Sequence, residues 1–308
     1  MSRRSSDPAR ATRQAGDGAL AWALMAPSLG ILALVALFPI VWNVWESLHR
    51  HDLRMPWLGR PFVGADNYVE ALQDVRFRSA AGHSLFFAAV CVALELVGGL
   101  GLALALHGQR RGRGVLRTAV ILPWAIPTVV VALIWRFLFD SPSGLVNIAW
   151  GMVSTVTPPT WFADAGAAWI PLILADVWKT TPFVAILLLA GLQNIDQTLY
   201  DAASMDGACR RQQLVHITLP LLAPALLVAF VFRSLDAFRV FDLVYVMTGG
   251  GPGTATEPLA LYTFTMLLRN LRFGFGAALS TMVFVVAFLV ALIAVRALGV
   301  ESLQEARS

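Results

Sequence analysis

The sequence predicts an all-α integral membrane protein with six transmembrane helices and with both ends of the chain on the cytoplasmic side. Of the 308 residues, 57% are hydrophobic and only 14% are charged, whereas a soluble domain usually has about a quarter of its residues charged. The apolar residues also gather into runs of the roughly 20 residues that a helix needs to cross a bilayer. The net charge of +4 is modest, and the basic residues are interpreted as signals of membrane topology, so no nucleic-acid partner is expected.

Six apolar runs define the expected spans. Residues 1–18 are basic and polar and are expected to form a disordered cytoplasmic tail, because the run after them is too long for a cleaved signal sequence. Residues 19–298 form the expected transmembrane domain, and residues 299–308 a second cytoplasmic tail. The spans are expected at residues 19–45, 83–106, 115–139, 169–192, 221–246 and 275–298.

Small residues and prolines mark special positions within these spans. Gly98, Gly101 and Ala105 share one face of the second span, which would let another helix approach closely. Pro123 and Pro127 lie one turn apart in the third span. Prolines at such positions are expected to kink or cap helices, since neighbouring helices satisfy the freed carbonyl groups.

The distribution of arginine predicts the orientation of the spans. The connection at residues 107–117 has four arginines and no acidic residue, whereas residues 140–168 contain neither Arg nor Lys. Because cytoplasmic loops carry the excess of basic residues, residues 107–117 and 193–220 are expected on the cytoplasmic side, together with both termini. The first connection, residues 46–82, has five arginines and counts against this orientation.

Residues 193–220, called the polar segment below, form the longest stretch of the C-terminal half that lipid cannot accommodate. Asp196 suits the N-cap of a helix at residues 197–205, and Gly207 suits the left-handed residue that closes a helix. A second short helix is expected at residues 208–216. The segment is therefore predicted to be a helix, a glycine break and a second helix.

The fifth span is expected to begin directly after the polar segment. Thr218 suits an N-cap, and Pro220 suits the first turn of the following helix, where a missing N–H costs nothing. The residue types alone are compatible with two environments for the polar segment: a groove on another protein or the headgroup region of the membrane.

The sequence lacks the features of a nucleotide or metal site. No G-x-x-x-x-G-K-[ST] phosphate loop is present, and the only lysine, Lys179, has no glycine-rich turn before it. The chain is therefore not expected to be an enzyme or to bind a metal or cofactor. If transport is driven by ATP, then ATP and Mg²⁺ bind to a separate ATPase subunit.

Charged residues recur at intervals of three in the fifth span, at Arg233, Asp236, Arg239 and Asp242. Residues three apart are neighbours on a helix, so these side chains can pair with one another and serve the structure alone. Alternatively, they form the polar wall of a substrate pathway, because charges inside membranes usually face a cavity or one another. With the nearby Phe238 and Tyr245, this wall would suit a sugar, whose hydroxyls need polar partners and whose rings pack on aromatic faces.

The fourth span contains a second group of this kind. Asp176 and Lys179 are three residues apart, so mutual pairing is the expected arrangement. Trp178 lies beside them, which makes Trp178 and Lys179 further hypothetical contacts for a substrate.

The polar segment resembles the EAA loop of ABC importer permeases across about twenty residues. The family usually has Glu where this chain has Asp201, a difference that keeps the charge. The resemblance implies that the segment forms a coupling helix that docks on an ATPase subunit. The matching residues are Asp201, Ala202, Ala203, Asp206, Gly207, Ala208, Ile217, Leu219 and Pro220.

Three further stretches, residues 178–183, 232–252 and 273–278, resemble the MalF/UgpA-type branch of these permeases, which imports sugars. The resemblance implies the type I ABC importer permease fold in a bacterial inner membrane. It also implies four kinds of partner: a second, different permease chain that completes the pathway, two ATPase subunits, an extracytoplasmic solute-binding protein and membrane lipid. A disaccharide such as trehalose or maltose is the favoured substrate.

Two other functions are compatible with a helical membrane protein. A secondary transporter would be driven by an ion gradient, but such proteins often contain inverted repeats, and no internal repeat is evident here. A non-transporting scaffold would not need charges in the fifth span. Dependence of uptake on a partner ATPase separates the importer from both alternatives.

Overall fold

The structure of the chain is a computed structural model that describes residues 22–108, 113–141 and 143–305. The predicted tail at residues 1–18 lies outside these residues, as do residues 109–112 of the predicted arginine-rich turn. Apart from two isolated β-bridges, the described residues form helices and the turns between them. Of the described helices, five are long and apolar enough to cross a membrane, or six if one sharply bent pair is counted as a span. The predicted all-α membrane fold is confirmed.

The first spanning helix runs from Trp22 to Ser47. It and the elements up to the polar segment comprise η1 (Ala33–Leu37), α2 (Phe38–Ser47), η2 (Pro56–Leu58), α3 (Asp66–Gln73), α4 (Val75–Gly108), α5 (Arg113–Ala125), α6 (Thr128–Leu138), α7 (Leu145–Val153) and α8 (Trp169–Gln193). The remaining elements are α9 (Gln197–Met205), α10 (Arg210–Gln213), η3 (Leu214–Thr218), α11 (Leu219–Phe238), α12 (Asp242–Met247), α13 (Leu259–Phe264), η4 (Thr265–Arg269) and α14 (Phe273–Glu305). The second and sixth predicted spans lie within α4 and α14, which are longer than expected.

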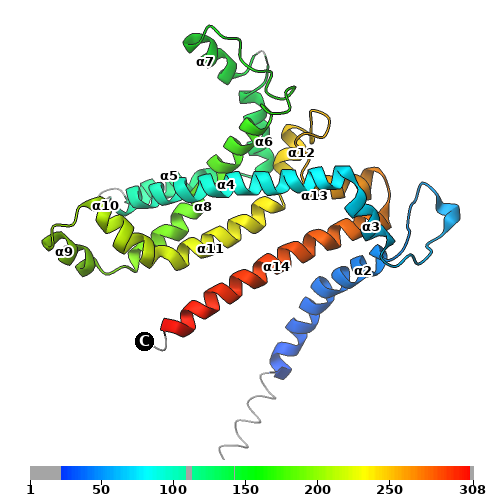
Figure 1. The fold of residues 1–308 in the computed structure, drawn as a ribbon, viewed down its shortest axis with the longest axis horizontal. Coiled ribbons are helices and arrows are strands. Elements are labelled where there is room, and N and C mark those ends of the chain that lie inside the picture. The colour runs from blue at the N-terminus through cyan, green and yellow to red at the C-terminus, as the bar shows by residue number, and fades with distance from the viewer. Residues whose placement is uncertain (1–21, 109–112, 142, 306–308) are drawn as a thin grey trace, which may run out of the picture.

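Helix α4 is the central element of the bundle and contributes to all three buried hydrophobic clusters. Its middle, at Phe87, packs against α6, α8 and α12. Its first turns, at Phe77, pack against α13 and α14, and its last turns, at Ala103, pack against α8 and α11. In Figure 1, α4 runs along the length of the bundle beside α8 and α11. Residues far apart in the sequence therefore meet along this helix.

Glycines bring α4 and α8 close together. A Cβ atom at Gly99 would lie 2.5 Å from Val184 Cγ1 and 3.2 Å from the backbone nitrogen of Ala185. Gly98 also faces α8, whereas a Cβ at Gly101 would meet nothing within 4 Å. The predicted close approach of another helix is confirmed, but it is centred on Gly98 and Gly99, and including Gly101 in the contact face was wrong.

The predicted third span is not one straight helix. Its two halves, Gly114–Ala125 and Thr128–Leu138, are bent by 87°. Pro127 has extended ψ (137°) and lies at the N-cap of α6, where its carbonyl accepts the N–H groups of Val130 and Val131. Because Pro127 has no N–H and disfavours helical geometry in the residue before it, the bend occurs here.

Among the prolines that lie within continuous helices, two follow shortly after a π-helical turn. The turn η1 ends two residues before Pro39, and η3 ends two residues before Pro220. The wider turn changes the hydrogen-bond register and accommodates a residue without an N–H, so the helix continues. The prediction that Thr218 caps a new helix is therefore wrong: Thr218 has helical φ and ψ (−65°, −54°), and Arg210–Phe238 is one spanning helix.

The predicted fifth span consists of two helices. Helix α11 ends at Phe238, and α12 begins at Asp242 after Phe241, whose φ and ψ are −136° and −65°. No Gly or Pro lies between them, so the local sequence does not mark the break. The charged residues three apart in sequence consequently do not form one ladder, because only Arg233 and Asp236 lie on α11.

Two pairs of helices extend away from the central bundle (Figure 1). Helices α2 and α14 pack against each other, and Asn43 joins them by donating hydrogen bonds to the Ala277 carbonyl at 3.2 Å and to Thr281 Oγ1 at 2.9 Å. At the opposite face, α6 and α7 project from the bundle as one arm. The region where α4, α8 and α11 meet lies between these extensions.

Candidate functional site

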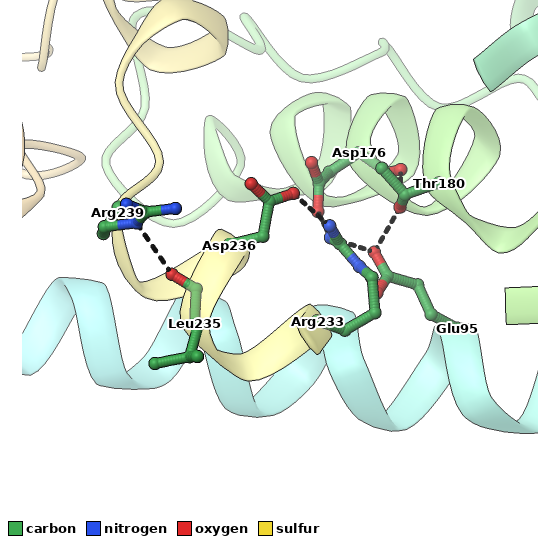
Figure 2. Close-up of polar contacts among 7 residues, drawn as sticks. All are labelled: Glu95, Asp176, Thr180, Arg233, Leu235, Asp236 and Arg239. Atoms are coloured by element: carbon green, nitrogen blue, oxygen red, sulfur yellow. Dashed lines mark hydrogen bonds and ion pairs between the residues drawn. The ribbon is translucent and has the colours of Figure 1, made fainter. Parts of the chain in front are cut away.

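A group of polar side chains lies buried where α4, α8 and α11 meet, and is called the charge cluster below. Figure 2 shows its members, Glu95 from α4, Asp176 and Thr180 from α8, and Arg233 and Asp236 from α11. The side chains of Arg233 and Glu95 are only 3% and 0% exposed. Burying such charges is costly unless they are paired, so the contacts of Arg233 decide whether the cluster is stable.

Arg233 donates hydrogen bonds to carboxylates from three helices. Its Nε and Nη2 atoms bind Glu95 in a bidentate pair at 2.6 and 2.9 Å. Nη2 also donates to Asp176 Oδ2 at 3.1 Å, and Nη1 donates to Asp236. The hydroxyl oxygen of Thr180 lies 2.5 Å from Glu95 Oε1 and 2.6 Å from the Asp176 carbonyl oxygen. The planar guanidinium thus ties the three helices together at one point.

The contacts in the charge cluster test the two ion pairs that are expected from sequence. The expected pair of Arg233 and Asp236 is confirmed. The expected pair of Asp176 and Lys179 is wrong, because Asp176 turns toward Arg233 of α11. Sequence reasoning missed Glu95, although a lone carboxylate in the middle of an apolar span indicates a buried partner elsewhere in the chain.

A cavity of about 160 Å³ opens beside the charge cluster, at the break between α11 and α12. Five ionisable residues line it: Asp176, Lys179, Asp236, Arg239 and Asp242. Thr128 and Thr180 add hydroxyl groups, and Phe241 adds an aromatic ring. The cavity thus combines carboxylates, cations, hydroxyls and an aromatic face, the mixture that binds small polar molecules in proteins.

Arg239 and Lys179 are placed differently from Arg233. Arg239 Nε donates to the Leu235 carbonyl at 3.2 Å, and Figure 2 shows its guanidinium on the far side of Asp236 from Arg233. Within the described part of the chain, no carboxylate lies within ion-pair distance of Arg239 or Lys179. Both cations are therefore open to a molecule in the cavity.

Besides Arg233, which is enclosed in the charge cluster, three of the residues proposed from sequence lie away from the cavity lining. Phe238 packs against the hydrophobic cluster formed by α3, α4, α13 and α14. Trp178 is half exposed and packs against Trp135 of α6, with ring centroids 6.1 Å apart. Tyr245 stacks on Phe241 at 5.3 Å. The break after α11 explains the positions of Phe238 and Tyr245. On one continuous helix the two rings would lie on the same face, but they lie on two different helices.

The polar segment is a helical hairpin. Helix α9 has the predicted bounds, and Asp196 caps it by accepting the backbone N–H of Thr198 at 2.9 Å. This hydrogen bond also lowers the pKa of the Asp196 carboxyl group. Gly207 has φ +81°, as predicted for the residue that closes the helix. The predicted helix and glycine break are confirmed.

Side-chain contacts hold the two arms of the hairpin together. Gln213 Nε2 donates to Ser204 Oγ at 2.9 Å, and the hydroxyl groups of Tyr200 and Thr218 lie 3.0 Å apart. Of the nine residues matched to the EAA loop, five are exposed, namely Asp201, Ala202, Asp206, Gly207 and Pro220. The other four, which are partly buried, are Ala203, Ala208, Ile217 and Leu219. The hairpin therefore presents charged and small residues on its outer surface.

Comparisons with known proteins agree with these features. Residues 97–305 match the family described as binding-protein-dependent transport system inner membrane component. The trehalose/maltose transport system permease protein MalF of Thermococcus litoralis is 41% identical over 270 residues, which are 87% of this chain and 90% of that protein. The trehalose transport system permease protein SugA of Mycobacterium tuberculosis is 36% identical over 281 residues, 91% of this chain and 89% of that protein.

A solved structure shows the same fold. The crystal structure of a bacterial ABC transporter involved in the import of the acidic polysaccharide alginate contains a chain with a TM-score of 0.78 and 24% identity. The similarity covers 94% of the present chain and 98% of that one, which establishes the type I ABC importer permease fold. With a family model that matches most of its length, the chain belongs to the binding-protein-dependent transport system inner membrane components, the permease subunits of ABC importers.

Proposed function

We propose that the chain is the permease subunit of an ATP-driven importer of a sugar, with a disaccharide such as trehalose or maltose as the favoured substrate. The observation that carries this proposal is the mixed polar and aromatic cavity between α8, α11 and α12. The names of the two relatives, a trehalose/maltose and a trehalose permease, support the substrate class.

The chemistry of the cavity suits a sugar. Lys179 and Arg239 offer N–H donors, while Asp236 and Asp242 offer acceptors, so alternating hydroxyl groups can be bound from both sides. Phe241 provides a face for the C–H side of a sugar ring. The cavity of about 160 Å³ forms one wall of the pathway, and a second, different permease chain supplies the other wall.

The hairpin of the polar segment is proposed to couple transport to ATP hydrolysis. Asp201, Ala202 and the other exposed residues of α9 would enter a groove on the ATPase, in the helix-in-groove mode. Arg210–Phe238 is one continuous helix from the hairpin to the charge cluster. A displacement of the hairpin would therefore reach the cavity through a rigid element.

The remaining partners follow from the family. The chain is an inner membrane component and not an enzyme, because a separate ATPase hydrolyses ATP in ABC importers. ATP and Mg²⁺ would therefore bind to two ATPase subunits, which we place on the cytoplasmic side with the hairpin and both termini. An extracytoplasmic binding protein would deliver the sugar at the opposite side.

Purification of the complex tests the proposal. The tagged chain would be purified from detergent-solubilised membranes, and ATPase activity would be measured with the binding protein and a panel of sugars. Co-purification of a second permease and an ATPase, with one sugar stimulating hydrolysis, is expected. A chain that purifies alone and whose uptake depends on an ion gradient would contradict the proposal and favour a secondary transporter.

A further inference from the structure

The charge cluster removes one arginine from the reach of any ligand. A guanidinium group has five N–H donors, and four hydrogen bonds to Glu95, Asp176 and Asp236 are already made by Arg233. The side chain of Arg233 is 3% exposed and does not line the cavity. The positive charge of Arg233 is thus already paired inside the protein when a ligand arrives.

The charges that remain at the cavity contain no surplus of cations. Lys179 and Arg239 contribute two positive charges to the lining, against the three carboxylates of Asp176, Asp236 and Asp242. Behind them, Glu95 and Arg233 form a bidentate pair with no net charge. The Asp236 side chain is 67% exposed, so its free carboxylate oxygen is accessible from the cavity.

This balance determines which sugars the cavity accepts. We propose that the cavity binds uncharged, polyhydroxylated sugars and discriminates against acidic sugars, with Asp236 and Asp242 as the residues that reject a ligand carboxylate. The inference rests on the proposed function and narrows its substrate class. The fold does not decide this point, because the same fold occurs in a transporter of an acidic polysaccharide.

The physical argument is Coulombic. An uncharged sugar can accept a hydrogen bond from a basic residue of the lining and donate one to an acidic residue, so both charges gain a partner. A ligand carboxylate within about 6–8 Å of Asp242, which has no ion-pair partner among the described residues, would bind on the order of tenfold to a hundredfold more weakly than a neutral group at the effective dielectric constant of protein sites. The two lining cations, Lys179 and Arg239, offset part of this repulsion, so we expect a preference of about tenfold for the neutral sugar over the acidic one.

A binding experiment on the whole complex tests the inference. The complete importer would be reconstituted in nanodiscs without the binding protein, because that protein has a selectivity of its own. Trehalose and maltose would be compared with their uronic acids, in which one primary alcohol is a carboxylate, by tryptophan fluorescence at millimolar ligand. Trp178 lies next to Lys179 in sequence and is half exposed, which makes it a suitable reporter.

At least one neutral sugar is expected to bind about tenfold or more tightly than its acid. Asp242→Asn and Asp236→Asn should each reduce this preference severalfold by strengthening binding of the acid. The matched control Asp66→Asn, at an exposed aspartate at the start of α3, should leave the preference unchanged.

Two results would overturn the inference while leaving a sugar importer in place: equal binding of acid and neutral sugar, or an unchanged preference in both aspartate variants. If neither sugar class binds and neither stimulates ATP hydrolysis in the presence of the binding protein, the proposed function itself fails, and the inference fails with it.

Discussion

Replacing Glu95 by glutamine should destabilise the protein strongly, because it removes the main partner of a buried arginine. Both side chains of the Arg233–Glu95 pair are almost fully buried, and the two hydrogen bonds measure 2.6 and 2.9 Å. Glutamine has nearly the same shape as glutamate, but its amide NH₂ would face an N–H group of the guanidinium. At least one buried donor would therefore lose its partner.

The magnitude follows from the geometry of the cluster. Breaking a buried ion pair by removing one partner typically costs about 3–5 kcal/mol. Arg233 retains Asp176 and Asp236, so we expect a smaller loss, about 2–3 kcal/mol, for this variant. The apparent melting temperature of the complex should fall by about 5 °C or more.

The assay is thermal unfolding of the purified complex, followed by fluorescence-detected size exclusion. Glu70→Gln serves as the matched control, because Glu70 pairs with Arg272 at the surface, where the side chains are 44% and 27% exposed. Exposed pairs contribute about 0–1 kcal/mol, so this variant should melt within about 2 °C of the wild type. If Glu95→Gln melts as the control does, the charge cluster is not a stabilising junction of α4, α8 and α11.

Three further variants test other parts of the structure. Gly207→Val should reduce sugar-stimulated ATPase activity severalfold without preventing insertion, because φ +81° strains a β-branched residue by about 1–2 kcal/mol or more. Asparagine tolerates this φ, so Gly207→Asn should have a smaller effect, and equal activity of the two variants would refute the reasoning. Gly99→Ala should lower the melting temperature, because its Cβ would lie 2.5 Å from Val184 Cγ1. Gly101→Ala should leave the melting temperature unchanged, and similar melting temperatures for the two variants would show that the contact between α4 and α8 is looser than described. Asp236→Asn should reduce sugar uptake more than it reduces the yield of assembled complex, and an equal loss of both would make this aspartate purely structural.

The sequence was sufficient where local chemistry determines the structure. The N-cap residue Asp196, the helix after it and Gly207 lie as predicted, because capping and positive φ depend on the residue itself and its immediate neighbours. The long apolar runs likewise predicted where the first, second, fourth and sixth spans lie, since crossing a bilayer requires about 20 apolar residues.

The sequence was insufficient where distant residues determine the structure. The partner of Arg233 is Glu95, 138 positions away, and no periodicity within one span can indicate such a contact. The break after Phe238 has no Gly or Pro to mark it, so the cavity at this break was also not predictable. The expected ladder failed for the same reason, because it assumed one continuous helix.

Protection of a single cysteine by sugar would test most directly whether the cavity lies on the sugar pathway. Val240 lines the cavity without providing a polar contact. The experiment would introduce Val240→Cys after replacing Cys91 and Cys209 by serine, with Val153→Cys, at a 91% exposed position of α7, as the control. We predict that the transported sugar slows alkylation of the cysteine at position 240 severalfold and leaves that at position 153 unchanged. Equal alkylation rates with and without sugar, in a complex that still transports it, would place the pathway elsewhere.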